Sequence, residues 1–244
     1  TWGSSPSPGN EQQNRWGSKS KIREGSLNYP GVESPAVDAA IDRLTAFEMQ
    51  LGPFAVAQLR IHAELMELIG HVPQHPMPMY VADTLSNPWH DSGHVPQIVA
   101  AIAEQRKFAN ELKRKRRINV VLGNPPYKEK AKGRGGWVED VTVEAGQAPV
   151  MKDLAGPTTA ILEDWMPPKD WGVGAHAKHL RNLYIYFWRW ATWKVSGTGL
   201  HASTGIEEVD RAGIVCFITA AGFLNGPGFE RMRDDLRRSC RAVW

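Results

Sequence analysis

The sequence contains few cysteines and no long apolar segment. Cys216 and Cys240 are the only two among 244 residues, and neither belongs to a Cys-x-x-Cys pair. We therefore interpret both as reduced structural thiols of a cytoplasmic protein. No run approaches the roughly 18 apolar residues that a transmembrane helix requires, and the first residues lack the apolar stretch of a secretory signal. We therefore expect no membrane partner.

Neither sign of charge is in large excess. The chain has 29 Lys and Arg against 26 Asp and Glu, for a net charge of +3. The positive residues cluster in KRKRR at Lys113–Arg117 and in RMRDDLRRSCR at 231–241. Such a run suits the solvated carboxyl end of a helix, where it offsets the helix dipole. It also suits a contact with nucleic-acid phosphates, and the sequence leaves both interpretations open.

Histidines occur in pairs four residues apart, at His71 and His75 and at His90 and His94. Two His at this spacing on one helix can bind zinc, but prolines and a glycine flank both stretches and disfavour a helix there. We therefore predict no metal site. The glycine-rich GRGGW at 133–137 lacks the preceding strand and the Lys-Ser/Thr of a phosphate loop, and we interpret it as a mobile lid.

Composition divides the chain into a polar tail and an ordered α/β region. Residues 1–34 are rich in Ser, Gly, Pro, Asn and Gln, which predicts a flexible tail. From residue 35 onward, strand-like apolar runs alternate with apolar residues at helical spacing, which is typical of a doubly wound α/β sheet. The predicted strands cover 44–49, 77–85, 118–123 and 213–224, and the predicted helices cover 54–70, 95–117, 179–195 and a segment from about 227.

The apolar run INVVLG at 118–123 does not alternate, which predicts a parallel strand covered on both faces. A Gly-rich insertion at about 128–175 follows it. Polar residues close three successive predicted strands, namely Glu48, Asp83 and Asn124. Because ligands bind at the carboxyl ends of the strands in doubly wound sheets, we expect these three residues to border a ligand site.

The segment Asn124-Pro125-Pro126-Tyr127 predicts a rigid turn, because proline lacks an N–H and fixes φ and the residue before a proline is held extended. The Asn124 side-chain oxygen and the Pro125 carbonyl can accept both hydrogens of an aromatic amine such as that of adenine. Two such acceptors favour the pyramidal, nucleophilic nitrogen. Tyr127 can stack on the base, which must be flipped out of a duplex to reach the turn.

Asn124 to Tyr127 resemble the catalytic motif of amino-methyltransferases that use S-adenosylmethionine, above all DNA adenine-N6 methyltransferases. The resemblance spans residues 36–244, through FEMQLGPFAVAQLR, VADTL, VVLGNPPYKEKAKGRGGWVE, NLYIYFWRWATWKV and GIVCFITAAGFLNGPGFERMRDDLRR. These blocks have the same order as in the methylase region of type ISP, single-polypeptide restriction–modification enzymes. The resemblance implies a Rossmann-like class I methyltransferase fold, with a partial catalytic domain at 35–244.

The resemblance also implies roles for individual residues. Glu48 stands where the family's acidic residue accepts the ribose hydroxyls of S-adenosylmethionine, and Asp83 where the family contacts the cofactor's adenine amine, with Thr84 beside that ring. Asn124 to Tyr127 hold the target adenine of double-stranded DNA. We further predict that DNA is contacted by the cationic residues after the motif, Lys128, Lys130, Lys132 and Arg134.

The sequence departs from the family upstream of Glu48, where no apolar strand is followed by the family's Gly-x-Gly cofactor loop. We therefore expect an incomplete piece, without that first strand or the late strands, that works with the rest of a larger restriction–modification polypeptide. A missing central strand would leave an apolar slot and unpaired backbone. Two alternatives remain open, an inactive nucleic-acid-binding remnant and a protein glutamine-N5 methyltransferase, which can use a similar turn.

Overall fold

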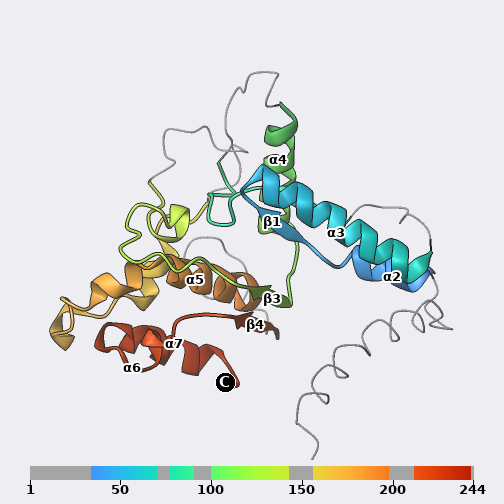
Figure 1. Ribbon diagram of the computed structural model, residues 1–244. Coiled ribbons are helices and arrows are strands. Elements are labelled where there is room, and N and C mark those ends of the chain that lie inside the picture. The colour runs from blue at the N-terminus through green and yellow to red at the C-terminus, as the bar shows by residue number, and fades with distance from the viewer. Residues whose placement is uncertain (1–33, 71–76, 91–99, 143–155, 198–211, 243–244) are drawn as a thin grey trace, which may run out of the picture. The chain divides into compact units, whose positions relative to one another are not determined.

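The computed structural model describes residues 34–70, 77–90, 100–142, 156–197 and 212–242 (Figure 1). The predicted tail at 1–34 lies outside these ranges, except for Ser34, which begins the first helix. The chain divides into two compact units. One is made of Thr1–Ala46 and Gln50–Met79, and the other of Phe47–Met49 and Tyr80–Trp244.

The first unit contains α2 (Ser34–Ile41) and α3 (Leu51–Ile69). Apolar residues at helical spacing predict α3, although the helix begins at Leu51 rather than at the predicted Phe54. Gly70 ends it, with a φ of 76° and a backbone N–H that donates to the Met66 carbonyl. Glycine adopts this left-handed conformation without a steric penalty. The predicted glycine stop is therefore confirmed.

Strands β1 (Ala46–Glu48) and β2 (Met79–Val81) lie at the boundary between the units in sequence. The second unit then contains, in chain order, α4 (Ala100–Lys115), β3 (Val120–Gly123), η2 (Gly136–Val138), η3 (Ile161–Trp165), η4 (Lys169–Trp171), η5 (Ala177–Arg181), α5 (Leu183–Ser196), β4 (Ile214–Phe217), α6 (Gly222–Asn225), η6 (Pro227–Phe229) and α7 (Glu230–Ser239), where η marks a 3₁₀ helix.

In the described ranges, the strands form two separate two-stranded sheets. β1 pairs with β2, and β3 pairs in parallel with β4, in a register that runs from Val120↔Ile214 to Gly123↔Phe217. The chain is therefore mixed α/β with small sheets, and one continuous doubly wound sheet is not found in these residues.

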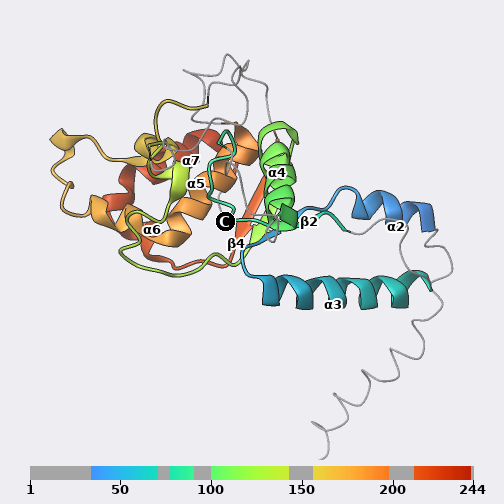
Figure 2. The ribbon, with the colours of Figure 1, turned by 90° about the horizontal axis from the view of Figure 1, so that it is seen from above.

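Among the described residues, side chains cover one face of the β3–β4 pair and leave the other exposed. Val121, Val215 and Phe217 pack against the buried core, and α5 lies beside β4 in both views (Figure 1, Figure 2). The alternate side chains point away from the core, so that Val120 is 51% exposed and Leu122 71%. The prediction of a strand covered on both faces is therefore wrong, because within the described residues only one layer packs against this sheet.

Helix α5 forms the centre of the core. Tyr184, Tyr186, Trp190 and Trp193 are each no more than 5% exposed. The ring of Trp193 meets that of Trp137 nearly edge to face, at a centroid distance of 4.8 Å, which is a favourable arrangement of two aromatic quadrupoles. The interpretation of this aromatic run as a buried helix rather than a stacking surface is confirmed.

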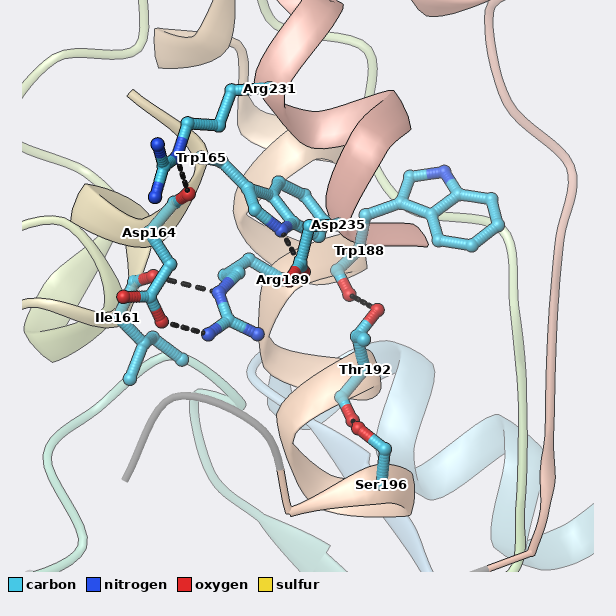
Figure 3. Close-up of polar contacts among 9 residues, drawn as sticks. All are labelled: Ile161, Asp164, Trp165, Trp188, Arg189, Thr192, Ser196, Arg231 and Asp235. Atoms are coloured by element: carbon cyan, nitrogen blue, oxygen red, sulfur yellow. Dashed lines mark hydrogen bonds and ion pairs between the residues drawn. The ribbon is translucent and has the colours of Figure 1, made fainter. Parts of the chain in front are cut away.

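A buried arginine joins α5 to η3. Arg189 is fully buried, and its guanidinium donates to the Asp164 carboxylate and the Ile161 carbonyl at 2.6 and 2.7 Å (Figure 3). Burial lowers the pKa of Arg189, and the charges of Asp164 and Asp235 oppose that shift, because they favour the charged form. The neighbouring Trp165 indole donates to Asp235 of α7 at 2.6 Å, so one polar cluster connects three elements.

We predict that Asp164→Asn lowers the free energy of unfolding by about 1–3 kcal/mol, because the buried guanidinium loses its directly paired carboxylate, keeps an acceptor there and retains only the charge of Asp235. The Asp164 side chain is 47% exposed, so the loss stays below that of a fully buried pair. Urea denaturation measures the change, and Asp170→Asn on η4 controls for removal of an exposed carboxylate. Equal stability of the two variants would contradict the role of this ion pair.

Candidate functional site

The Asn-Pro-Pro-Tyr turn starts directly after β3, as predicted. Gly123 ends the strand, and a Cβ at this position would lie 2.9 Å from the Phe217 ring, so a larger residue would displace that ring. Because β4 runs parallel to β3, its end lies beside the turn, where the Ile218 N–H donates to the Gly123 carbonyl at 3.1 Å. Asn124 is exposed and Pro125 is buried, so the turn presents its amide to solvent from an anchored backbone.

The Tyr127 hydroxyl holds the turn against the end of β4. It lies 2.6 Å from the Ile218 carbonyl oxygen and 3.2 Å from Asn124 Oδ1. A hydroxyl has one proton to donate, and the shorter contact indicates that Tyr127 donates it to the Ile218 carbonyl. The Asn124 oxygen can therefore still accept a hydrogen bond from a ligand. Tyr127 is 52% exposed, which leaves ring surface available for stacking.

Tyr184 of α5 stands behind this turn, with its ring centroid 6.3 Å from that of Tyr127. Burial raises the pKa of Tyr184, a hydrogen bond from Asn182 opposes the rise, and the charge of Glu129 adds to it. Tyr184 is therefore a neutral aromatic support at neutral pH, and it can contribute no charge to the site.

The predicted cofactor residues lie at the ends of β1 and β2, which are adjacent. The Ala82 N–H donates to the Glu48 carbonyl at 3.0 Å, so the backbones that carry Glu48 and Asp83 are close together. Asp83 is exposed, and Glu48 and Thr84 are half-buried. One Asp83 carboxylate oxygen accepts the Leu85 N–H at 2.9 Å, which makes Asp83 the first residue of an Asx turn.

Lys113 supports this turn from inside the protein, with 1% of its surface exposed. Its ammonium donates to the Asp83 carbonyl at 2.6 Å and to the Ser86 hydroxyl at 2.9 Å. Arg114 likewise donates to a backbone carbonyl. The first two residues of KRKRR are therefore structural, a role that sequence reasoning missed. The available signal was position, since Lys113 follows the buried Ala109 by four residues on one side of α4.

The segment 128–134 follows the turn and carries the predicted DNA contacts, Lys128, Lys130, Lys132 and Arg134, all of which are exposed. Three hydrogen bonds attach it to the start of α5, from Leu183 N–H to the Lys128 carbonyl at 2.9 Å, from Lys130 N–H to Asn182 Oδ1 at 3.2 Å, and from Ala131 N–H to the Arg181 carbonyl at 2.7 Å. The structure thus places these cations on one attached loop beside the turn.

The glycine-rich segment at 133–137 is a packed turn instead of the predicted lid. The N–H groups of Gly133 and Gly135 donate to one Glu139 oxygen, at 2.7 and 3.1 Å. The Glu139 side chain is 4% exposed and pairs with Arg181 at 2.6 Å. Backbone N–H groups that converge in a turn can bind an anion, and here the Glu139 carboxylate occupies that position.

Gly136 brings this turn into contact with Leu85, the residue that follows Asp83 and Thr84. Its φ is 52°, and a Cβ at this position would lie 2.0 Å from the Leu85 carbonyl oxygen. Only glycine permits this approach. Leu85 belongs to the Asx turn of Asp83, so the glycine-rich segment contacts the turn that follows β2.

Among the described residues, no group of three or more His, Cys, Asp or Glu side chains is placed to hold a metal ion. Of the histidine pairs, His71, His75 and His94 lie outside these ranges. Both cysteines are free thiols, and Cys216 is exposed. No helix in the described part of the chain has the length and apolarity to cross a membrane.

No protein-family model matches the chain. Its structure is similar to part of the ATP-dependent type ISP restriction–modification enzyme LlaBIII bound to DNA, with a TM-score of 0.57 and 18% identity over 89% of this chain and 13% of that one. It is also similar to part of DrdV in a DNA complex, with a TM-score of 0.51 and 17% identity over 90% of this chain and 18% of that one. The chain thus shares the fold of a segment of a type ISP restriction–modification enzyme, and it covers only 13% to 18% of the length of these two proteins.

Sequence comparison gives shorter matches of another kind. Over 43 residues, the chain is 56% identical to the uncharacterized protein y4wM of Sinorhizobium fredii and 60% identical to a putative binding protein of Brucella melitensis. Each match covers 18% of this chain, and they cover 6% and 7% of those proteins respectively. The probable peptide-binding protein YejA of Agrobacterium fabrum is 46% identical over 43 residues. Matches of this length describe one segment and do not assign the whole chain to a family.

We predict that Tyr127→Phe loosens the junction between the turn and β4 while keeping the aromatic ring. A typical hydrogen bond contributes about 1 kcal/mol, so the Ile218 amide should exchange with solvent about fivefold faster. Hydrogen exchange followed by NMR measures this rate, and Tyr80→Phe in β2 controls for removing a tyrosine hydroxyl elsewhere. Unchanged protection at Ile218 would show that the Tyr127 hydroxyl does not hold the turn.

Proposed function

We propose that this chain carries the target-base turn of a DNA adenine-N6 methyltransferase that belongs to a restriction–modification enzyme. One observation carries the proposal. Asn124 is exposed at the end of β3, on a turn whose backbone is anchored by a buried Pro125 and by the Tyr127 hydroxyl. An acceptor held in place before the base arrives costs little reorganisation during the reaction.

The chemistry assigned to the chain is acceptance of hydrogen bonds from an adenine amine. The Asn124 side-chain oxygen and the Pro125 carbonyl take its two hydrogens, which draws the nitrogen lone pair out of conjugation with the ring and makes it nucleophilic. Tyr127 stacks on the base, a contact that contributes about 1–3 kcal/mol. The base reaches the turn only after it is flipped out of the duplex.

S-adenosylmethionine, when bound, supplies the electrophilic methyl group. The adjacent strand ends fit its adenosine portion in part, because Glu48 and Asp83 offer carboxylates of the kind that ribose hydroxyls and an adenine amine require. Asp83 has one oxygen committed to the Leu85 N–H, and its other oxygen remains for an amine. The sequence before Glu48 supplies no Gly-x-Gly turn, so the fit is incomplete.

Double-stranded DNA is the proposed partner. The exposed cations of the 128–134 loop support this assignment, as does similarity in fold to two proteins whose structures contain DNA. Phosphate contacts from Lys and Arg provide most of the sequence-independent affinity for DNA. The same cations favour a second candidate function, an inactive nucleic-acid-binding remnant, which differs from the first by lacking cofactor binding and methyl transfer.

We predict that this chain alone binds S-adenosylmethionine weakly or not at all. The reason is the missing Gly-x-Gly turn together with the partial commitment of Asp83. Isothermal titration calorimetry measures the affinity, and a dissociation constant in the micromolar range would refute this expectation. This measurement tests whether the cofactor site is complete. It does not test the base-binding turn, which the next experiment addresses.

In a polypeptide that joins this region to a Gly-x-Gly loop, we predict that Asn124→Ala lowers methyl transfer to DNA by at least about a hundredfold, the effect typical of removing one preorganised polar group. DNA affinity should change little, because phosphate contacts dominate it. Transfer of a radiolabelled methyl group measures the rate. Asn119→Ala, an exposed asparagine just before β3, is the matched control, and activity within a few-fold of it would exclude the role assigned to Asn124.

A further inference from the structure

The 128–134 loop is held by side chains that belong neither to the turn nor to the cationic set. Glu139 accepts the N–H groups of Gly133 and Gly135 on one oxygen and the Arg181 guanidinium on the other. With 4% of its side chain exposed, this carboxylate is a buried charge, which a protein tolerates when it is paired and fully hydrogen-bonded. Glu139 therefore fixes the backbone at the carboxyl end of the loop.

Asn182 holds the middle of the same loop. It is the N-cap residue of α5, yet its side chain makes no capping bond to that helix, although an asparagine at this position usually accepts a bond from the first turn. Its Oδ1 accepts the Lys130 N–H instead. Lys130 has a φ of 50°, a left-handed conformation uncommon outside glycine, so an 8% exposed amide is committed to a strained loop residue.

We infer that Glu139 and Asn182 are positioning residues that hold the 128–134 loop in the conformation in which its cations contact DNA phosphates. This inference rests on the proposed function, which assigns those cations to DNA. A loop that is ordered before binding loses less conformational entropy when DNA arrives. Its cations also engage several phosphates together, which steepens the dependence of affinity on salt.

Glu139→Gln distinguishes a positioning role from a purely electrostatic one, because the two change the affinity for DNA in opposite directions. The substitution removes one negative charge, which by electrostatics alone would strengthen binding to DNA. It also places an amide N–H₂ group where a carboxylate oxygen now accepts bonds, which disrupts the pairing with Arg181 or with the glycine turn. Positioning therefore predicts weaker binding, by about fivefold for the loss of a hydrogen bond that contributes about 1 kcal/mol.

The experiment measures fluorescence anisotropy of a labelled random-sequence duplex titrated with the full chain at several salt concentrations. We expect Glu139→Gln to lower the affinity. We also expect the slope of log K against log salt concentration to become shallower by about one unit or more, which corresponds to the loss of at least one phosphate contact. Glu129→Gln is the matched control, because Glu129 is an exposed carboxylate in the same loop. It should bind at least as tightly as the unaltered chain.

Asn182→Ala provides a second, neutral test that does not depend on the folding of the first variant. It removes the acceptor of the Lys130 N–H, together with the Asn182 hydrogen bond to Tyr184, and leaves the net charge unchanged. We expect the same direction of change in affinity and slope. Thermal unfolding of each variant verifies that it is folded. If Glu139→Gln does not fold, unaltered DNA binding by Asn182→Ala alone overturns the inference.

A combined Lys128→Gln, Lys130→Gln, Lys132→Gln and Arg134→Gln variant distinguishes failure of this inference from failure of the proposed function. If that variant keeps its affinity and salt dependence, the loop does not contact DNA and the DNA-facing part of the proposal fails as well. If it loses binding while Glu139→Gln and Asn182→Ala behave like Glu129→Gln, DNA contact stands and the positioning role is overturned. Loss of binding in all three supports both.

Discussion

Burial of α5 is the constraint on which the second unit depends. Trp188 packs edge to face against an aromatic ring of β4, Arg189 pairs with Asp164 of η3, and Lys194 donates to the Lys113 carbonyl at the end of α4 at 2.6 Å. Apolar burial supplies the driving force, at about 25 cal/mol per Å². The long cationic side chains of α5 then hydrogen-bond to backbone carbonyls of the neighbouring elements, Arg189 to Ile161 and Lys194 to Lys113. These bonds attach η3 and the end of α4 to the helix.

The charged residues described above therefore have two different roles, one inside the protein and one on its surface. Lys113 and Glu139 lie inside the protein, where each satisfies backbone groups of a turn, the Asp83 turn in one case and the glycine-rich turn in the other. The cations at 128–134 remain on the surface. Internal charges shape the loops, and external charges are displayed by them.

Local signals predicted a large part of this arrangement. The glycine stop at Gly70, the buried aromatic helix and the placement of Asn124 directly after a parallel strand follow from short-range sequence patterns, because each depends on backbone conformation or on apolar spacing. The roles of Lys113, Glu139 and Asn182 were missed, because each depends at least in part on a partner 30 or more residues away in the sequence, namely the Asp83 carbonyl, the Arg181 guanidinium and the Lys130 N–H. The exposed face of β3 was also missed, since an apolar run indicates burial without specifying how many layers are available to cover it.

Delivery of an adenine amine to Asn124 is tested most directly by NMR of the Asn124 side-chain amide, assigned by comparison with Asn124→Ala. The chain is titrated with a duplex that contains one mismatched adenine and with an otherwise identical duplex that carries a purine without the exocyclic amine. We predict that the Asn124 amide and the Tyr127 ring signals shift with the adenine duplex, and that the amide shift is lost with the purine lacking the amine. Equal amide shifts with both duplexes, or shifts confined to the 128–134 loop, would contradict a base-accepting turn.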